Sequence, residues 1–158
     1  AALVASGMSD PDKIGVMGTS MGGITAAGIM ATQPTVVAGV SLIGSPEPVA
    51  FAKDQVSQIP AELLAQLPAE LLTKTYAQIG QFDLSQQVER LAGRPMFFFN
   101  GTADTMVPYK YVDDFERRFS GNAALQQTVF KHATGGTHHV PHKMHQAAVA
   151  FLKQHIIG

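Results

Sequence analysis

Residues 14–23 read Ile-Gly-Val-Met-Gly-Thr-Ser-Met-Gly-Gly, an apolar run that passes directly into a Gly-x-Ser-x-Gly turn. Such a turn between a strand and a helix lifts the serine hydroxyl above the sheet. Gly18 and Gly22 are expected there because side chains would collide where strand and helix approach. Ser20 is therefore a candidate nucleophile, and the backbone N–H of Met21, at the positive end of the new helix, is a candidate oxyanion donor. The five-residue pattern leaves one alternative, a glycine-rich turn whose serine only caps the helix.

Composition and charge exclude several classes of function. The chain has 158 residues, of which 46% are hydrophobic, and a net charge of −1, which indicates one globular domain with no bias toward nucleic acids or membrane surfaces. It contains no cysteine, so disulfides, thiolate catalysis and cysteine-ligated metals are excluded. No apolar run is long enough to span a bilayer. We expect a cytoplasmic location, and any signal peptide would lie upstream of Ala1.

The rest of the chain alternates between apolar strands and amphipathic helices. Continuous apolar runs predict buried strands, and apolar residues three and four apart predict helices. The expected strands begin at Ile14 and cover 36–44, 94–101 and 125–131, and the expected helices run from the serine turn to Pro34, over 83–93 and 108–119, and from Met144 to Ile156. This alternation predicts an α/β fold with a parallel sheet and about four strands present.

A helical insertion is expected over residues 45–82. Two near copies of eight residues begin at Pro60 and Pro68, and each places proline in a plausible first helical position, which predicts two short helices. The insertion either covers the active site or only packs against the domain. Upstream, residues 1–7 are expected to be the tail of a helix, and residues 8–13 a turn.

Three reactive residues follow three of the expected strands. Ser20 follows the first strand, Asp104 the third and His138 the fourth. Because the carboxyl ends of parallel strands meet at one edge of a sheet, these side chains are expected to converge there. The chain order serine, aspartate, histidine is one in which catalytic triads occur.

Neighbouring residues leave alternatives open for this site. His139 is an alternative to His138 as the base, because the register of a loop is not set by the sequence alone. His142 and His145, three residues apart on a helix, are candidate metal ligands together with His138 or His139. The remaining histidines and three further aspartates are expected to be solvated residues, a helix cap or surface charges: His132, His155, Asp83, Asp113 and Asp114.

The motifs resemble a known family. They are Gly18-Thr-Ser-Met-Gly-Gly23, Asp83-Leu-Ser followed by Pro95, Asn100-Gly-x-x-Asp-x-x-Val-Pro108, and Gly136-Thr-His138 before a closing helix. Over essentially the whole chain, the sequence resembles the carboxyl-terminal half of an α/β-hydrolase, similar to small bacterial esterases and dienelactone-hydrolase-like enzymes. The resemblance implies Ser20 as nucleophile, His138 as general base and then acid, and Asp104 as the group that orients His138. It also implies acyl transfer to water without a metal or an organic cofactor.

Two departures from the family are visible. Asn100 and Gly101 stand where relatives usually carry His-Gly, a position that shapes a turn and is expected to tolerate substitution. The upstream strands and the His-Gly loop that donates the second oxyanion-hole N–H are not in this sequence. Loss of one such donor costs on the order of 10²–10³ in turnover.

The predicted function is hydrolysis of carboxylic esters with small or medium acyl groups through an acyl-enzyme on Ser20. Met21, Met106, Val107 and Phe51 are the expected apolar contacts of the substrate. The alternatives are a peptidase of the same fold, and an incomplete half-domain that needs upstream residues or a partner chain. The expected ligand is a small-molecule ester, with no nucleic acid or membrane partner. The strand at Ile14 is expected to pair, at its outer edge, with an upstream segment or a second copy.

Overall fold

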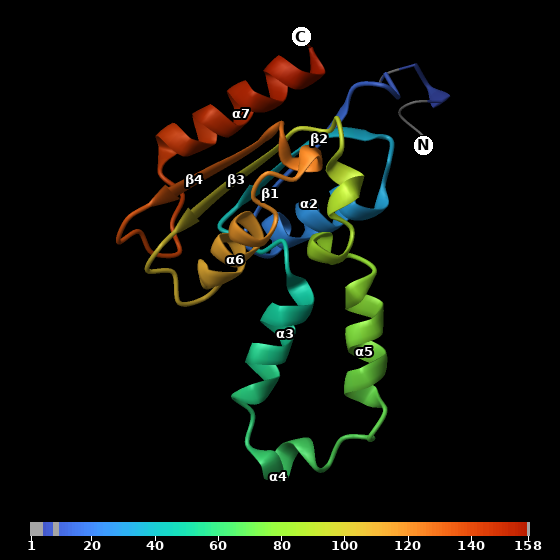
Figure 1. The fold of residues 1–158 in the computed structure, drawn as a ribbon, viewed down its shortest axis with the longest axis vertical. Helices are drawn as coiled ribbons and strands as arrows, with labels where there is room; N and C mark the ends of the chain where they lie inside the picture. Colours follow the sequence, from blue (N-terminus) through green and yellow to red (C-terminus); the bar gives the residue numbers. More distant parts are fainter. Residues whose placement is uncertain (1–4, 8–9, 158) are drawn as a thin grey trace.

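One parallel sheet organises the molecule (Figure 1). The computed structural model describes residues 5–7 and 10–157. Its strands are β1 (Ile14–Thr19), β2 (Val36–Leu42), β3 (Met96–Gly101) and β4 (Thr128–Ala133), paired in parallel in the order β1-β2-β3-β4. The predicted parallel α/β sheet is therefore confirmed. β3 is buried along its whole length, as its apolar sequence predicts.

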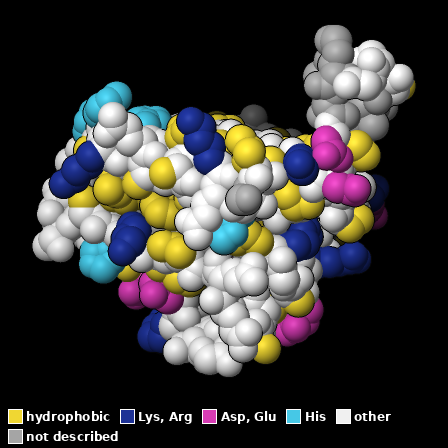
Figure 2. All heavy atoms as spheres, turned by 90° about the horizontal axis from the view of Figure 1, so that it is seen from above, with side chains coloured by type: hydrophobic (Ala, Val, Ile, Leu, Met, Phe, Trp, Pro, Cys, Tyr) yellow, Lys and Arg dark blue, Asp and Glu magenta, His cyan; other side chains and the backbone are white. Residues whose placement is uncertain are grey.

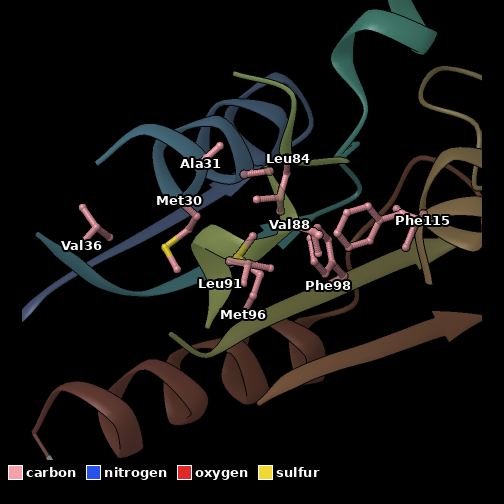
Figure 3. Close-up of a cluster of buried hydrophobic side chains, with 11 residues drawn as sticks. Met30, Ala31, Val36, Leu84, Val88, Leu91, Met96, Phe98 and Phe115 are labelled. Atoms are coloured by element: carbon pink, nitrogen blue, oxygen red, sulfur yellow. The ribbon is translucent and has the colours of Figure 1, made fainter. Parts of the chain in front are cut away.

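Helices cover both faces of the sheet. Helices α2 (Met21–Thr32) and α6 (Lys110–Arg118) lie on one face, and α7 (His142–Ile156) lies on the other (Figure 1). On the α2 face, Met30, Leu91, Met96, Phe98 and Phe115 form the centre of a buried cluster (Figure 3). On the α7 face, a second cluster contains Val40, Leu42, Phe97, Phe99 and Ala148. Each face of the sheet is thus covered by an apolar layer, and loops lie at the carboxyl ends of the strands.

The insertion contains three helices rather than the predicted two. They are α3 (Pro48–Ser57), α4 (Ala61–Leu64) and α5 (Leu71–Gly80). α3 begins at Pro48, whereas Pro60 precedes α4 as its N-cap and Pro68 lies in the turn before α5. The two near copies therefore fold differently, because local propensity does not set how far a short helix extends. α3 and α5 form the two legs of a hairpin that projects from the body, with α4 at its far end (Figure 1).

Two other predicted boundaries differ from the structure. Residues 83–93 form two 3₁₀ turns, η1 (Leu84–Gln86) and η2 (Val88–Leu91), instead of one α-helix. The Asp83 carboxylate accepts hydrogen bonds from the backbone N–H and the hydroxyl of Ser85, which caps η1. β4 begins later than predicted because a third 3₁₀ turn, η3 (Ala123–Leu125), occupies the start of that segment.

The predicted helix tail and turn at residues 1–13 lie partly outside the described residues. Among the residues that are described, no helix is both long and apolar enough to cross a membrane.

Candidate active site

Ser20 occupies a strained turn between β1 and α2. Its backbone has φ 58° and ψ −121°, a conformation that L-residues rarely adopt and that concentrates at functional sites. The Ser20 N–H donates to the Leu42 carbonyl oxygen at 2.8 Å, which fixes the turn to the end of β2. The Ser20 side chain makes no capping hydrogen bond to α2. The alternative reading of Ser20 as a simple helix cap is therefore wrong.

Gly18 lets α2 approach β1 and Gly23 lets it approach β2, so only one of the two motif glycines is required by close contact. A Cβ on Gly18 would lie 1.9 Å from the Gly22 carbonyl oxygen, so Gly18 is required by close backbone contact. A Cβ on Gly22 would meet no atom within 4 Å, so the collision expected there is absent. The second steric requirement falls on Gly23, where a Cβ would lie 2.8 Å from the Leu42 carbonyl oxygen.

His138 lies between Ser20 and Asp104. His138 Nδ1 is 2.7 Å from Asp104 Oδ2, and His138 Nε2 is 2.8 Å from Ser20 Oγ. The Asp104 side chain is fully buried and the His138 side chain is 18% exposed. Because an ionised carboxylate only accepts hydrogen bonds, the proton on His138 belongs on Nδ1, which leaves Nε2 to accept from the serine hydroxyl.

Backbone groups orient the Asp104 carboxylate. Its second oxygen, Oδ1, accepts from the N–H groups of Met106 at 2.9 Å and Val107 at 3.1 Å. These bonds hold Oδ2 toward His138. The loop after β3 thus positions the acid before any substrate is present.

The loops that carry Asp104 and His138 are bonded to each other. Ala103 N–H donates to the Gly136 carbonyl oxygen at 2.8 Å, and Gly135 N–H donates to Thr102 Oγ1 at 2.8 Å. A Cβ on Gly101 would lie 2.3 Å from the Gly136 carbonyl oxygen, so this contact requires glycine. The contact sets the register of the second loop, which sequence reasoning left open.

The surroundings of Asn100 contradict the expectation that this position tolerates substitution. Its side chain is fully buried, and Nδ2 donates to the Gly44 carbonyl oxygen at 2.9 Å. This bond ties the end of β3 to the loop after β2. An apolar substitution would leave a buried carbonyl unpaired, which costs about 1–3 kcal/mol, so the prediction of tolerance is wrong.

The competing histidines and aspartates lie elsewhere. His139 and His142 are exposed, and the rings of His132 and His155 lie against Tyr109 and Phe151. In the described part of the chain, no three histidine or acidic side chains are grouped so as to hold a metal ion. Asp114 pairs with Arg117 and Arg118 on α6, as expected of a surface charge.

Two of the predicted substrate contacts border a cavity and two do not. Met21 and Phe51 line a cavity of about 640 Å³ between α2, α3 and α5. Met106 is 64% exposed on the Asp104 loop, and Val107 is buried; neither lines this cavity. Contact of Met106 and Val107 with substrate stays a prediction, whereas their backbone N–H groups have a defined partner in Asp104.

Glu47 was missed by the sequence analysis. It precedes α3, its side chain is 7% exposed, and its carboxylate pairs with the Arg118 guanidinium of α6. Burial raises the pKa of Glu47 from 4.5 to about 7, against the opposing effect of Arg118. Its burial depends on Arg118, 71 residues away in the sequence, so the local sequence carried no signal of it.

Comparisons with known proteins agree with this geometry. The chain is 34% identical over 148 residues to YitV of Bacillus subtilis (strain 168), which is named provisionally as an esterase, and 26% identical over 145 residues to Esterase YjfP of Escherichia coli (strain K12). These matches cover 90% and 92% of this chain, but only 56% and 57% of the relatives. The chain therefore spans little more than half the length of the curated relatives that it matches.

Solved structures show the same fold. A puromycin-hydrolyzing peptidase of Mycobacterium tuberculosis superposes with a TM-score of 0.73 at 22% identity, over 98% of this chain and 24% of that one. TT1662 from Thermus thermophilus superposes with a TM-score of 0.70 at 17% identity, over 99% of this chain and 58% of that one. The fold is that of the α/β-hydrolases. The model of the prolyl oligopeptidase family matches residues 1–157, and the chain belongs to that family.

Proposed function

We propose that this chain carries the catalytic triad of a serine hydrolase that cleaves carboxylic esters, with Ser20 as nucleophile, His138 as base and Asp104 as the orienting acid. The contact of His138 with both Ser20 and Asp104, at 2.8 and 2.7 Å, carries the proposal. The esterase names of the two curated relatives support the choice of substrate class.

Acylation begins with attack of Ser20 Oγ on the ester carbonyl carbon. His138 Nε2 takes the hydroxyl proton as the Oγ–C bond forms, and Asp104 stabilises the resulting imidazolium through Nδ1. When the tetrahedral intermediate collapses, the C–O bond to the alcohol breaks and His138 returns its proton to the alcohol oxygen. The product of this half-reaction is an ester of Ser20.

Deacylation repeats these steps with water. His138 takes a proton from water, the water oxygen attacks the acyl carbon, and Ser20 Oγ leaves with the proton from His138. The carboxylic acid departs and the enzyme is restored. In both half-reactions the Met21 N–H, in the first turn of α2, is the proposed donor to the oxyanion. The second donor is proposed to come from upstream residues.

A peptidase is the second candidate function. The family description and the name of the first structural neighbour favour it. The same triad cleaves amides, with His138 protonating the leaving amine. Turnover of alanine p-nitroanilide would favour the peptidase. We expect hydrolysis of p-nitrophenyl butyrate without turnover of the anilide, which would favour the esterase.

Covalent labelling tests the triad directly. A fluorophosphonate should add to the purified 158-residue chain, with the adduct mapped to Ser20 by mass spectrometry, and Ser20→Ala should abolish the adduct. Ser120→Ala, which changes an exposed serine, is the matched control and should label like wild type. A folded wild-type chain that stays unlabelled would show that the serine is not activated in this chain.

A further inference from the structure

The cavity between α2, α3 and α5 is apolar and begins beside Ser20. Its floor is the outer face of α2 from Met21 to Ile29, and its walls are formed by α3 and by the end of α5 and the residue Phe82. Met21 follows Ser20 directly in the chain, so the nucleophile and the cavity share one end of α2. Eight residues of helix rise by about 12 Å, which gives the length of the floor.

The residues that line the cavity favour an uncharged ligand group. Of the residues that the structure describes, none with a charged side chain lines the cavity, and the polar ones that do are Thr25 and Gln55. The Thr25 hydroxyl donates to the Met21 carbonyl oxygen at 2.9 Å, so its hydrogen is already used within α2. Gln55 is exposed and lies at the rim. An uncharged, apolar group therefore fits this site, and a carboxylate or an ammonium group does not.

The walls of the cavity are held in place by contacts outside it. Phe51 packs edge-on against Tyr111 of α6, with ring centroids 5.7 Å apart. Asp54 accepts from the Tyr111 hydroxyl at 2.7 Å and pairs with Lys110. The Asp83 carboxylate accepts from Val49 N–H at 3.2 Å, which joins the two ends of the hairpin. The cavity is thus formed before a ligand binds, as ligand sites commonly are.

We propose that this cavity binds the acyl chain of the substrate, and that the preferred acyl group is a linear chain of roughly eight carbons, the length that about 12 Å of helix accommodates. The proposal rests on the proposed ester hydrolysis at Ser20 and extends it to a substrate class. It narrows the expectation of small or medium acyl groups to the medium class, since a volume of about 640 Å³ would leave an acetyl group largely without contacts.

Two p-nitrophenyl alkylphosphonates, with methyl and octyl groups on phosphorus, test the proposal in a single turnover. Ser20 Oγ bonds to phosphorus, p-nitrophenolate leaves, and the serine proton passes to His138. Since each buried methylene contributes roughly fourfold in binding, the octyl compound should label Ser20 at least tenfold faster. Ala52→Phe, which fills the cavity from α3, should remove this preference by slowing the octyl compound.

Further variants distinguish a failure of the acyl site from a failure of the proposed function. Ala65→Phe makes the same change at an exposed site of the insertion and should keep the octyl preference. Val56→Phe, also on the cavity wall, serves as a second variant if Ala52→Phe does not fold. If both compounds label Ser20 of the wild type at equal rates, the proposed acyl site is wrong, whereas the proposed triad is supported.

Binding of 1-octanol, an uncharged chain of eight carbons, measured by calorimetry, covers the case in which Ser20 is not labelled. Binding that is lost in Ala52→Phe and kept in Ala65→Phe would support the apolar site while the proposed function fails. Absence of both labelling and binding would overturn both proposals.

Discussion

At the scale of single residues, the site depends on backbone conformations that only certain residues allow. Ser20 sits at φ 58° because β1 must turn sharply into α2, and Gly18 and Gly23 provide the space for that turn. Backbone strain at Ser20 is maintained by the hydrogen bond from its N–H to Leu42. Steric tolerance in this motif is therefore set by neighbouring strands, not by the motif alone.

Alanine at two adjacent glycines should have opposite effects on stability. Gly23→Ala places a Cβ 2.8 Å from the Leu42 carbonyl oxygen, and we expect a loss of about 1–3 kcal/mol in the free energy of unfolding. Gly22→Ala enters open space within α2 and should gain about 0.4–1 kcal/mol. Urea unfolding followed by circular dichroism measures both, and equal effects would contradict the assigned contacts.

Asp104→Asn should inactivate the enzyme without unfolding it. An asparagine oxygen can still accept from Met106 and Val107, but an amide facing His138 no longer favours the tautomer with the proton on Nδ1. We expect kcat to fall about 10⁴-fold, measured with p-nitrophenyl butyrate or, in a single turnover, as the rate of phosphonate labelling. Asp113→Asn on the exposed face of α6 is the control, and a comparable loss there would exclude a specific role for Asp104.

At the scale of elements, the hairpin of α3 and α5 is attached to the body through a few polar contacts at its base. Glu47 pairs with Arg118, Asp54 pairs with Lys110, and Leu84 N–H donates to the Pro46 carbonyl oxygen at 3.0 Å. Farther out, Leu63 is 54% exposed and Leu71 is 43% exposed. The base of the insertion is thus tied to the domain, whereas its far end buries little apolar surface.

Burial of Glu47 should make stability depend on pH. Its pKa is raised to about 7 by burial, so the folded state holds this proton more tightly than the unfolded state does. The free energy of unfolding should therefore fall as pH rises from about 4.5 to 7, by up to about 3 kcal/mol. Glu47→Gln should remove that part of the slope in urea unfolding at pH 5 and 8. Glu62→Gln, at an exposed site of α4, should unfold like wild type at both pH values.

At the scale of the whole molecule, the sheet has one poorly covered side. β1 is the first strand of the sheet and pairs with β2 alone among the described strands. Met17 on β1 is 43% exposed, while β3 is buried throughout. Seen from the α7 side, hydrophobic side chains form exposed patches among lysines and arginines (Figure 2). An apolar edge strand without proline or an inward charge is a template for pairing.

We therefore propose that another strand, from an upstream segment or a second copy, covers the outer edge of β1. The purified 158-residue chain should not behave as a monodisperse monomer in size-exclusion chromatography with light scattering. Met17→Lys should reduce its association by placing a charge on the edge. Val149→Lys, at a residue of α7 that is 40% exposed, should leave association unchanged. A wild-type monomer that unfolds cooperatively would contradict the proposal.

The sequence by itself determined the parallel sheet and the residues that meet at its edge. Apolar runs separated by helical spacing define strands and crossovers locally, and Ser20, Asp104 and His138 each follow a strand, so their convergence needs only the general rule for parallel sheets. The strained turn at Ser20 is likewise a property of the Gly-x-Ser-x-Gly pattern in that context.

Tertiary structure decided what depends on contacts between distant segments. His138 rather than His139 faces Ser20 because the loops of Asp104 and His138 are bonded through Gly136. Gly23, not Gly22, is sterically required because Leu42 of the neighbouring strand lies against it. Asn100 is tied to Gly44 after β2, and the burial of Glu47 and the cavity along α2 follow from how the insertion packs. Such packing brings together residues that are tens of positions apart in the chain. The local periodicity of the sequence does not indicate these contacts.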